Sequence, residues 1–312
     1  MRELMKAGQY DVFHSHRPEH AGHLAKIAKE LSIPCRIAHA HNTRWAKGRK
    51  TFFNTLRYWR YRLLGQAMTR RYATSLLGSS NDGLRYFFGS GNYGKDVRKS
   101  LYCGIPLVPF EQQSVPALRS EYHGQYGIPQ NSLVIGCVGS LDDQKNHRFL
   151  IRAFAELAKR DPRYVLFIAG EGYQRSNLET QVRSLNLTDQ VRMPGICTNI
   201  PELMCNLFDV FALTSSFEGF GLVFVEAVAA GLHAVCSDVV TNDLLSVLPE
   251  WLTPLSLNAP LSIWADALEA GSKRRRTPME GVQTIRQTPF SIENSAAALL
   301  DIYRRDIVAA QR

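Results

Sequence analysis

The sequence predicts an α/β protein with two doubly wound parallel-sheet domains. Short β-branched or apolar runs alternate along the whole chain with helix-length amphipathic segments, which is typical of parallel sheets covered by helices on both faces. The alternation is interrupted once, near 106–132, where four prolines lie in a mixed polar segment. A chain of 312 residues, 45% of them apolar, is long enough to form two such domains.

Four runs in the first part are predicted strands, and helical segments near 19–31, 51–72 and 81–88 separate them. The strands are "YDVFHSH", "CRIAHAH", "ATSLLGSS" and "RKSLYCG". A further amphipathic helix is predicted at about 292–308. We assign 1–112, together with the C-terminal helix at about 290–312, to the first domain.

Five runs in the second part are predicted strands: "SLVIGCVGS", "YVLFIAGEG", "QVRMPG", "DVFALTSS" and "HAVCSD". The helices between them fall near 147–159, 174–185, 199–206 and 222–230. These elements define a second domain over 113–289. In doubly wound sheets, ligands bind beyond the carboxyl ends of the strands, so the residues that follow these strands are the candidate site.

The segment "FEGFGLVFVEA", 217–227, is predicted to run from a loop into a helix. Gly219 and Gly221 let the backbone turn tightly and leave amides free at the helix N-terminus, which is an anion site. The amides at this turn are those of Phe220, Gly221, Leu222 and Val223. The flanking carboxylates of Glu218 and Glu226 suit paired hydroxyls, so the segment fits a sugar nucleotide. Alternatively, Glu226 offsets the helix dipole and Glu218 is a solvated loop residue.

A second candidate segment is "GCVGSLDDQKNH". Its strand ends in Gly139, Ser140 follows, and Lys145 precedes a helix, where a lysine can neutralise a diphosphate as a point charge. The alternative is a solvated lysine near a helix start. "AGEG" and "MPGICTNI" also end strands in glycine and can bring backbone close to a flat base. Ile196, in the latter, is a candidate donor contact.

Two histidine pairs follow strands in the first part: His14 with His16, and His39 with His41. Alternation puts both members of a pair on one face of the sheet, and two such pairs could build a metal site. However, no carboxylate or cysteine accompanies them in a ligand-like spacing. We therefore predict no metal.

The formal charge of +9 is concentrated in one stretch, because 36–81 holds ten Lys and Arg and no acid. Within it, the segment 44–71 interleaves basic and aromatic residues. This pattern fits an amphipathic element on an anionic membrane surface, a nucleic-acid patch, or a solvated basic face over a core. No apolar run approaches the roughly 20 residues of a membrane span. The six scattered cysteines favour a reduced, cytoplasmic compartment over a disulfide framework.

Together these elements resemble the donor-binding domain of retaining GT-B glycosyltransferases, in the large family 4 that includes bacterial polysaccharide and lipopolysaccharide enzymes. Glu218 and Glu226 match its E-x7-E signature, and 132–240 follows its pattern almost element by element. "QKNH" and "HAHNTR" look most like enzymes of exopolysaccharide assembly. The resemblance implies two Rossmann-like domains facing a cleft. It also implies that the first domain is incomplete, lacking roughly 60–80 residues at about 30 per strand–helix unit.

The resemblance also implies roles for individual residues. Lys145 would contact the donor diphosphate, Glu218 the transferred sugar and Glu226 the ribose. His41, followed by Asn42, matches a first-domain position that faces the donor sugar, so His41, Lys145 and Glu218 are the candidate catalytic residues. The family holds the diphosphate with Lys, Arg and a helix dipole, and neither a metal nor another cofactor is expected.

One position departs from the family pattern. The family usually has arginine directly after the glycine of the second domain's first strand, and this chain has Ser140 there. Losing a guanidinium beside a developing diphosphate should cost about 2–4 kcal/mol of transition-state stabilisation.

The resemblance implies a retaining transferase that moves a sugar from a nucleoside diphosphate, UDP above all, to a polysaccharide or lipid-linked glycan. Such an enzyme would be cytoplasmic, and peripheral at the inner face of the membrane. The alternative is a truncated protein that binds nucleotide or a partner without turnover. A sugar-nucleotide epimerase fits E-x7-E less well. We expect no nucleic-acid partner, because that function would leave the second half unexplained.

Overall fold

The computed structural model describes residues 1–41, 64–89, 97–111, 115–240 and 242–311. These residues form two compact units. Unit 1 comprises Met1–Gly104 and Ile292–Arg312, and unit 2 comprises Ile105–Ser291. Each unit is described below by itself.

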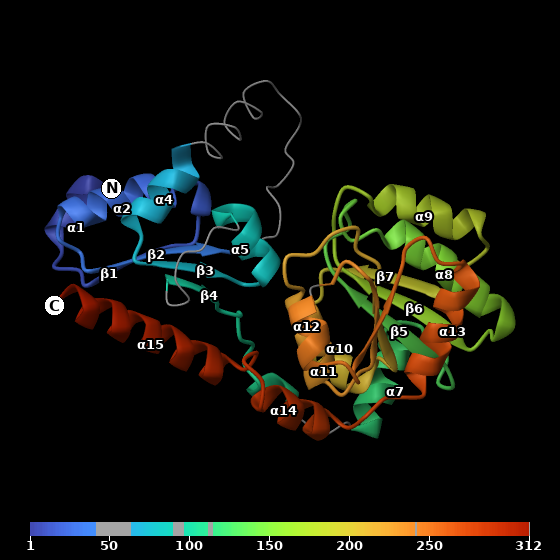
Figure 1. Cartoon of the computed structure of the whole chain (residues 1–312). Helices are drawn as coiled ribbons and strands as arrows, with labels where there is room; N and C mark the ends of the chain where they lie inside the picture. Colours follow the sequence, from blue (N-terminus) through green and yellow to red (C-terminus); the bar gives the residue numbers. More distant parts are fainter. Residues whose placement is uncertain (42–63, 90–96, 112–114, 241, 312) are drawn as a thin grey trace. The chain divides into compact units, whose positions relative to one another are not determined.

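Unit 1 is a parallel four-stranded sheet in the order β1-β2-β3-β4. The strands are β1 (Val12–Ser15), β2 (Cys35–Ala40), β3 (Ser75–Gly78) and β4 (Arg98–Ser100). The helices are α1 (Arg2–Ala7), α2 (Pro18–Glu30), α4 (Gln66–Tyr72), α5 (Asn81–Phe88) and α15 (Ile292–Ala310). Figure 1 shows α1, α2 and α4 on one face of the sheet and α15 on the other.

The two faces of β2 explain this layering. Cys35 and Ile37 point to the α15 side and pack with Ile302, whereas Ala38 and Ala40 belong to a second cluster with Ala21 of α2. Because side chains alternate along a strand, His39 lies on the α15 side with Cys35 and Ile37.

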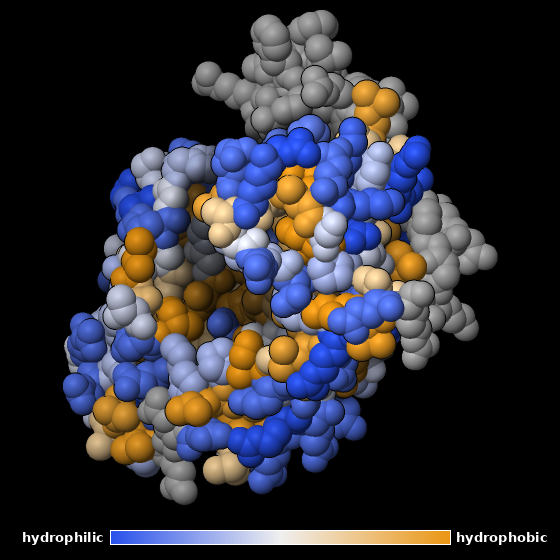
Figure 2. Space-filling view, turned by 90° about the vertical axis from the view of Figure 1, so that its left-hand side faces the viewer, coloured by the Kyte–Doolittle hydropathy of each residue, from blue (hydrophilic) through white to orange (hydrophobic). Residues whose placement is uncertain are grey.

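Viewed from the side of unit 1, the surface is mostly hydrophilic with separate hydrophobic patches (Figure 2).

Unit 2 is a parallel six-stranded sheet in the order β10-β9-β8-β5-β6-β7. The strands are β5 (Leu133–Val138), β6 (Tyr164–Ala169), β7 (Val191–Gly195), β8 (Val210–Leu213), β9 (Ala234–Ser237) and β10 (Leu252–Leu255). The α-helices are α7 (Pro116–Gln125), α8 (His147–Arg160), α9 (Arg175–Ser184), α10 (Ile200–Asn206), α11 (Leu222–Ala229), α12 (Asn242–Val247), α13 (Leu261–Ser272) and α14 (Pro278–Arg286). A 3₁₀ turn, η2, covers Val108–Phe110.

The order of the strands places a switch point in the middle of unit 2. The chain runs from β5 outward through β6 to β7, then returns to the other side of β5 with β8 and continues outward to β10. Loops that leave β5 and β8 therefore diverge and leave a crevice between their carboxyl ends, where doubly wound sheets bind ligands. The predicted fold class, two parallel-sheet α/β domains, is confirmed.

Several elements of unit 2 were not predicted. β10 contains Pro254, and proline in a short run argues against a strand; β10 tolerates it because it lies at the edge of the sheet. α7 begins with Pro116, within the segment that we interpreted as a break. Proline is acceptable there because the first residue of a helix needs no intrahelical N–H bond.

The basic-aromatic segment 44–71 lies mostly outside the described residues, and only 64–71 is described. That described part enters α4. Among the residues that the structure describes, no helix has both the length and the apolar character of a membrane span.

Candidate active site

The loop between β5 and α8 positions Lys145. The amide of Lys145 donates to Oδ1 of Asp142 at 3.1 Å, and the next residue, Asn146, has φ 51°. This left-handed residue turns the chain into α8. A β-carbon on Gly139 would lie 3.4 Å from Cγ and Cε of Lys145, so the lysine side chain runs directly over the end of β5.

Lys145 forms an ion pair with Glu218, from the loop after β8. Nζ of Lys145 lies 2.7 Å from Oε1 of Glu218, and the two side chains are only 17% and 5% exposed. The hydroxyl of Ser215 also donates to Oε1 of Glu218, at 2.5 Å. Neither residue is therefore a solvated loop residue. A buried pair of this kind is stable only while both charges keep their partners.

Gln144 connects the same two loops through hydrogen bonds to the backbone of the loop after β8. Nε2 of Gln144 donates to the carbonyl of Phe217 at 3.1 Å, and its own carbonyl accepts from the amide of Ser216 at 2.7 Å. Thr214 adds a hydroxyl bond to the carbonyl of Asn146 at 3.0 Å. The Lys145–Glu218 pair is thus held across the switch point by two connected loops.

The N-terminus of α11 presents free amides beside this pair. Gly221 caps the helix with φ +84°, a backbone conformation that L side chains rarely adopt, and its β-carbon would lie 2.7 Å from the ring of Phe224. Among the described residues, the amides of Gly221, Leu222 and Val223 have no backbone acceptor. Gly219 and Phe220 complete the turn before the helix. The arrangement can hold an anion.

Glu226 lies in the second turn of α11 and is half-buried. Burial raises the pKa of its carboxyl group. Within the described part of the chain, this carboxylate has no hydrogen bond or ion pair. A desolvated acceptor of this kind favours hydroxyl donors from a ligand.

Glycines bring the ends of β5, β6 and β7 together. The backbone at Gly170 has φ +150°, and a β-carbon there would lie 1.9 Å from the carbonyl oxygen of Gly139. The amide of Gly170 donates to the carbonyl of Gly195 at 2.8 Å. Ile196 follows and is 76% exposed, so it offers an apolar surface at the end of β7.

Ser140 does not supply the missing cation. Its side chain is exposed, and its hydroxyl donates to Oδ2 of Asp142 at 2.7 Å.

The structure brings together most of the predicted residues of the second domain: Gly139, Ser140, Lys145, Glu218, Gly219, Phe220, Gly221, Leu222, Val223 and Glu226.

Sequence reasoning missed the residues that position Glu218 and Lys145. Ser215 and Gln144 are small or neutral polar residues in loops, a class that is usually solvated. Their only signal is position, since each lies within three residues of a predicted site residue.

Four histidines of unit 1 gather at the carboxyl ends of β1 and β2: His14, His16, His39 and His41. His14 Nε2 lies 3.2 Å from His39 Nδ1, and His16 Nδ1 lies 2.7 Å from His41 Nε2. Within each pair along the chain, the ring centroids are 4.2 Å apart. Cys103 Sγ lies 3.5 Å from His41 Nδ1.

Three of these four rings are poor bases. Burial, and then the neighbouring histidines, lower the pKa of His14 to about 4 and that of His39 to about 3. Burial and His16 also lower the pKa of His41. At neutral pH His14 and His39 are therefore uncharged. Asn42, which follows His41 in the matched motif, lies outside the described residues.

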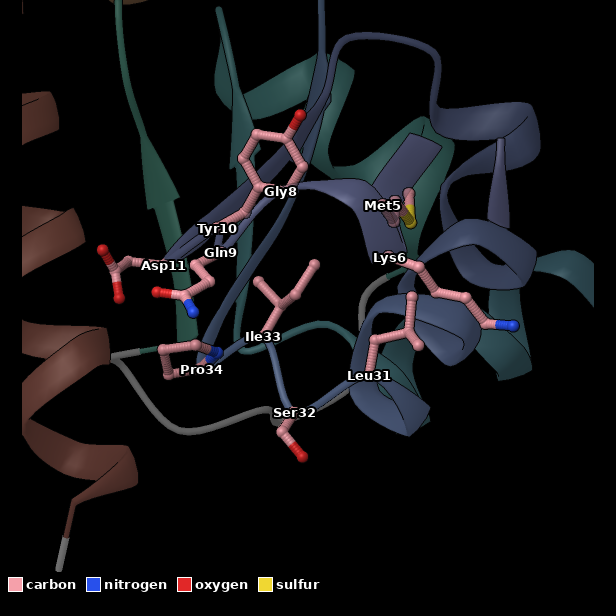
Figure 3. Close-up of a pocket in the computed structure, with 10 residues that line it drawn as sticks. All are labelled: Met5, Lys6, Gly8, Gln9, Tyr10, Asp11, Leu31, Ser32, Ile33 and Pro34. Atoms are coloured by element: carbon pink, nitrogen blue, oxygen red, sulfur yellow. The ribbon is translucent and has the colours of Figure 1, made fainter. Parts of the chain in front are cut away.

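A pocket of about 410 Å³ opens elsewhere in unit 1 (Figure 3). It is lined by Met5, Lys6, Gly8, Gln9, Tyr10, Asp11, Leu31, Ser32, Ile33 and Pro34. It lies where the chain enters β1 and β2, at the amino ends of the strands. Ligands of this architecture bind at the opposite ends, so we assign this pocket no role in the site.

Comparisons with known proteins agree on one family. A family model described as "Glycosyl transferases group 1" matches residues 119–243. The chain is 33% identical over 304 residues to "Putative glycosyltransferase EpsF" of Bacillus subtilis, covering 96% of this chain and 76% of that protein.

Two further proteins are informative. Over 101 residues, 32% of this chain, the sequence is 41% identical to 27% of a Campylobacter jejuni protein. That protein is named "N-acetylgalactosamine-N,N'-diacetylbacillosaminyl-diphospho-undecaprenol 4-alpha-N-acetylgalactosaminyltransferase". The crystal structure of Anabaena HepE in complex with UDP matches at a TM-score of 0.77 with 20% identity, covering 96% of this chain and 80% of that one. The crystal structure of HepE in complex with UDP-glucose matches at a TM-score of 0.72 with 20% identity, covering 99% of this chain and 81% of that one.

Proposed function

The chain belongs to the group 1 glycosyltransferases, and we propose that it is a retaining enzyme that transfers a sugar from a UDP-linked donor to a polysaccharide or lipid-linked glycan. The observation that carries the proposal is the Lys145–Glu218 pair beside the free amides of α11, at the switch point of unit 2. It supplies a cation, an anion site and a hydroxyl acceptor within one small region.

Each group has a role in this proposal. Lys145 and the amides from Phe220 to Val223 bind the diphosphate, Glu218 accepts hydrogen bonds from the transferred sugar, and Glu226 accepts them from the ribose. Ile196 provides an apolar surface for the base. Because HepE binds UDP and UDP-glucose, we propose the same class of donor for this chain.

The chemistry depends on stabilising the diphosphate as it leaves. Lys145 and the α11 amides are fixed before the reaction, so they stabilise the developing charge without reorganisation. We therefore propose that the donor site uses no metal and no other cofactor. His41 is the residue of unit 1 that we propose as a hydrogen-bond partner of the sugar.

We further propose a lipid-linked acceptor and a peripheral position at the cytoplasmic face of a membrane. The composition of segment 44–71 and the diphospho-undecaprenol in the name of the Campylobacter jejuni relative support this proposal. Vesicles containing anionic lipid should retain the chain at low salt and release it at high salt. Equal binding to neutral vesicles would argue against it.

Ser140 favours a second candidate function, nucleotide binding without turnover. Its hydroxyl is bonded to Asp142, and it brings no positive charge to the diphosphate. A protein of this kind would bind UDP and release none from a UDP-sugar.

UDP release from a panel of UDP-sugars, with membranes as the source of acceptor, tests both candidates. We expect one donor to be turned over by the wild type, and Glu218→Gln to lower kcat for that donor at least 10-fold because the sugar loses its charged acceptor. Lys159→Ala, an exposed lysine of α8, is the matched control and should leave turnover unchanged. UDP binding by calorimetry without turnover of any donor would reject the enzyme and support the second candidate.

A further inference from the structure

The histidine cluster of unit 1 brings together three side chains that can ligate a metal, whereas the sequence spacing predicted no metal. One ligand atom from each of His14, His16 and His39 lies within 4.8 Å of the other two. His14 and His16 come from β1 and its end, and His39 comes from β2, its parallel neighbour. The three rings converge because adjacent parallel strands end at the same edge of the sheet.

Hydrogen bonds fix which ring nitrogens face one another. Nδ1 of His14 lies 2.7 Å from the hydroxyl of Tyr303 on α15, which leaves Nε2 for the cluster. Nδ1 of His39 faces His14, and its Nε2 is buried without a hydrogen-bond partner among the described residues. Nδ1 of His16 bonds to His41, so Nε2 is the nitrogen of His16 that remains for a ligand. Ligating histidines typically hold their second nitrogen in this way.

The spacing is close to that of a tetrahedral site. Zn–N bonds of about 2.0–2.1 Å place two imidazole nitrogens roughly 3.4 Å apart. Nε2 of His14 and Nδ1 of His39 are already 3.2 Å apart. The third ligand atom lies within 4.8 Å of the other two, so it has to move inward by up to about 1.4 Å. His16 is exposed, so its ring has room to move and the site is open to solvent.

We propose that His14, His16 and His39 bind one divalent transition-metal ion of the zinc class, with water in the fourth position. Neutral imidazoles are the ligands that zinc, nickel, copper and cobalt prefer. On binding, the ion takes the place of the proton between His14 and His39, and that proton moves to the second nitrogen of its own ring, so both ligands stay neutral imidazoles. The site is built from unit 1 alone and does not depend on the proposed glycosyl transfer.

The test is a titration of the whole chain, without a histidine tag, after a chelator has removed bound metal. Co²⁺ is the probe because its visible absorption reports tetrahedral coordination, and Zn²⁺ is then added to displace it. We expect one Co²⁺ per chain and complete displacement by Zn²⁺. His16→Ala should weaken binding at least 10-fold, and it keeps the fold because the side chain is exposed. His20→Ala, an exposed histidine of α2, is the matched control.

A second variant tests the positioning role of Tyr303. Removal of its hydroxyl in Tyr303→Phe leaves all three ligands in place and should weaken Co²⁺ binding by about 10-fold. The proposal is overturned if the wild type binds no stoichiometric Co²⁺, or if His16→Ala binds Co²⁺ as tightly as the wild type and His20→Ala do. UDP binding by unit 2 is measured on the same samples, so a failure of the metal site is distinguishable from a failure of the proposed function.

Discussion

The two units each bury a carboxylate, but the two carboxylates lie in different places and have different roles. In unit 1, Asp306 of α15 lies under the sheet, where Oδ2 accepts from Thr74 and Ser75 and Oδ1 accepts from Arg305. In unit 2, Glu218 lies beyond the carboxyl end of β8 and pairs with Lys145. The first carboxylate fastens a helix to a sheet, and the second lies where a ligand would bind.

The difference shows how position decides the use of a buried charge. The partners of Asp306 come from β3, from the residue before that strand and from its own helix, so a ligand cannot replace them without opening the core. The pair of Lys145 and Glu218 is held by loops at a switch point. In the function that we propose, a donor inserts its diphosphate and hydroxyls between the two groups while each keeps a partner.

The largest expected effect comes from Lys145→Ala. The diphosphate loses its one predicted side-chain cation, and kcat/KM for the UDP-sugar should fall about 10²–10³-fold. The same change leaves Glu218 buried without its charge partner, and the free energy of unfolding of unit 2 should fall by about 3 kcal/mol. UDP release and urea unfolding measure the two effects.

A paired variant separates stability from activity. Lys145→Met with Glu218→Gln removes both charges, so it should recover most of the lost stability but none of the turnover. Recovery of turnover in this double variant would contradict a donor role for the pair.

Gly170→Ala should have the next largest effect, and it acts on unit 2 alone. Its β-carbon would lie 1.9 Å from the carbonyl oxygen of Gly139, and neither backbone can move without breaking the ends of β5 and β6. We expect about 2–4 kcal/mol of destabilisation, measured by urea unfolding. Gly124→Ala, in α7, is the control: a β-carbon there meets nothing within 4 Å, and stability should rise slightly.

Asp306→Asn tests whether the buried carboxylate of unit 1 serves to fasten α15 to the sheet. The amide keeps one acceptor but loses the charge that Thr74, Ser75 and Arg305 bind, so unit 1 should lose about 1–3 kcal/mol. Amide hydrogen exchange should quicken in β2 and β3 and stay unchanged in β5. UDP affinity should not change, and a loss of UDP binding would show that the two carboxylates are not independent.

Glu226→Gln should have the smallest effect. Replacing the carboxylate with an amide weakens the hydrogen bonds that we propose to the ribose, by about 1 kcal/mol, or roughly 5-fold in the affinity for UDP. The affinity for 2′,3′-dideoxy-UDP, which lacks the ribose hydroxyls, should not change. An equal loss with both ligands would place Glu226 away from the ribose.

Much of the fold followed from local pattern, and the exceptions have physical causes. The apolar run "YVLFIA" is buried at every position in β6, as expected of a strand covered on both faces. β10 and α7 were not predicted because proline usually ends a strand or helix, whereas the edge of a sheet and the first turn of a helix tolerate it. The glycines at 170, 195 and 221, where the sequence predicted a tight turn or a strand ending in glycine, each adopt a positive φ that a side chain would strain.

The sequence by itself determined the alternation of strands and helices, the turn into α11 at Gly221 and the spacing of Glu218 and Glu226, because each depends on residues close together in the chain. Only the tertiary structure decided which charges and rings meet. Lys145 and Glu218 are 73 residues apart, and His14 and His39 are 25 apart. Each pair exists because parallel strands end at a common edge of a sheet, and strand order is set by the packing of the whole unit, which no local pattern encodes.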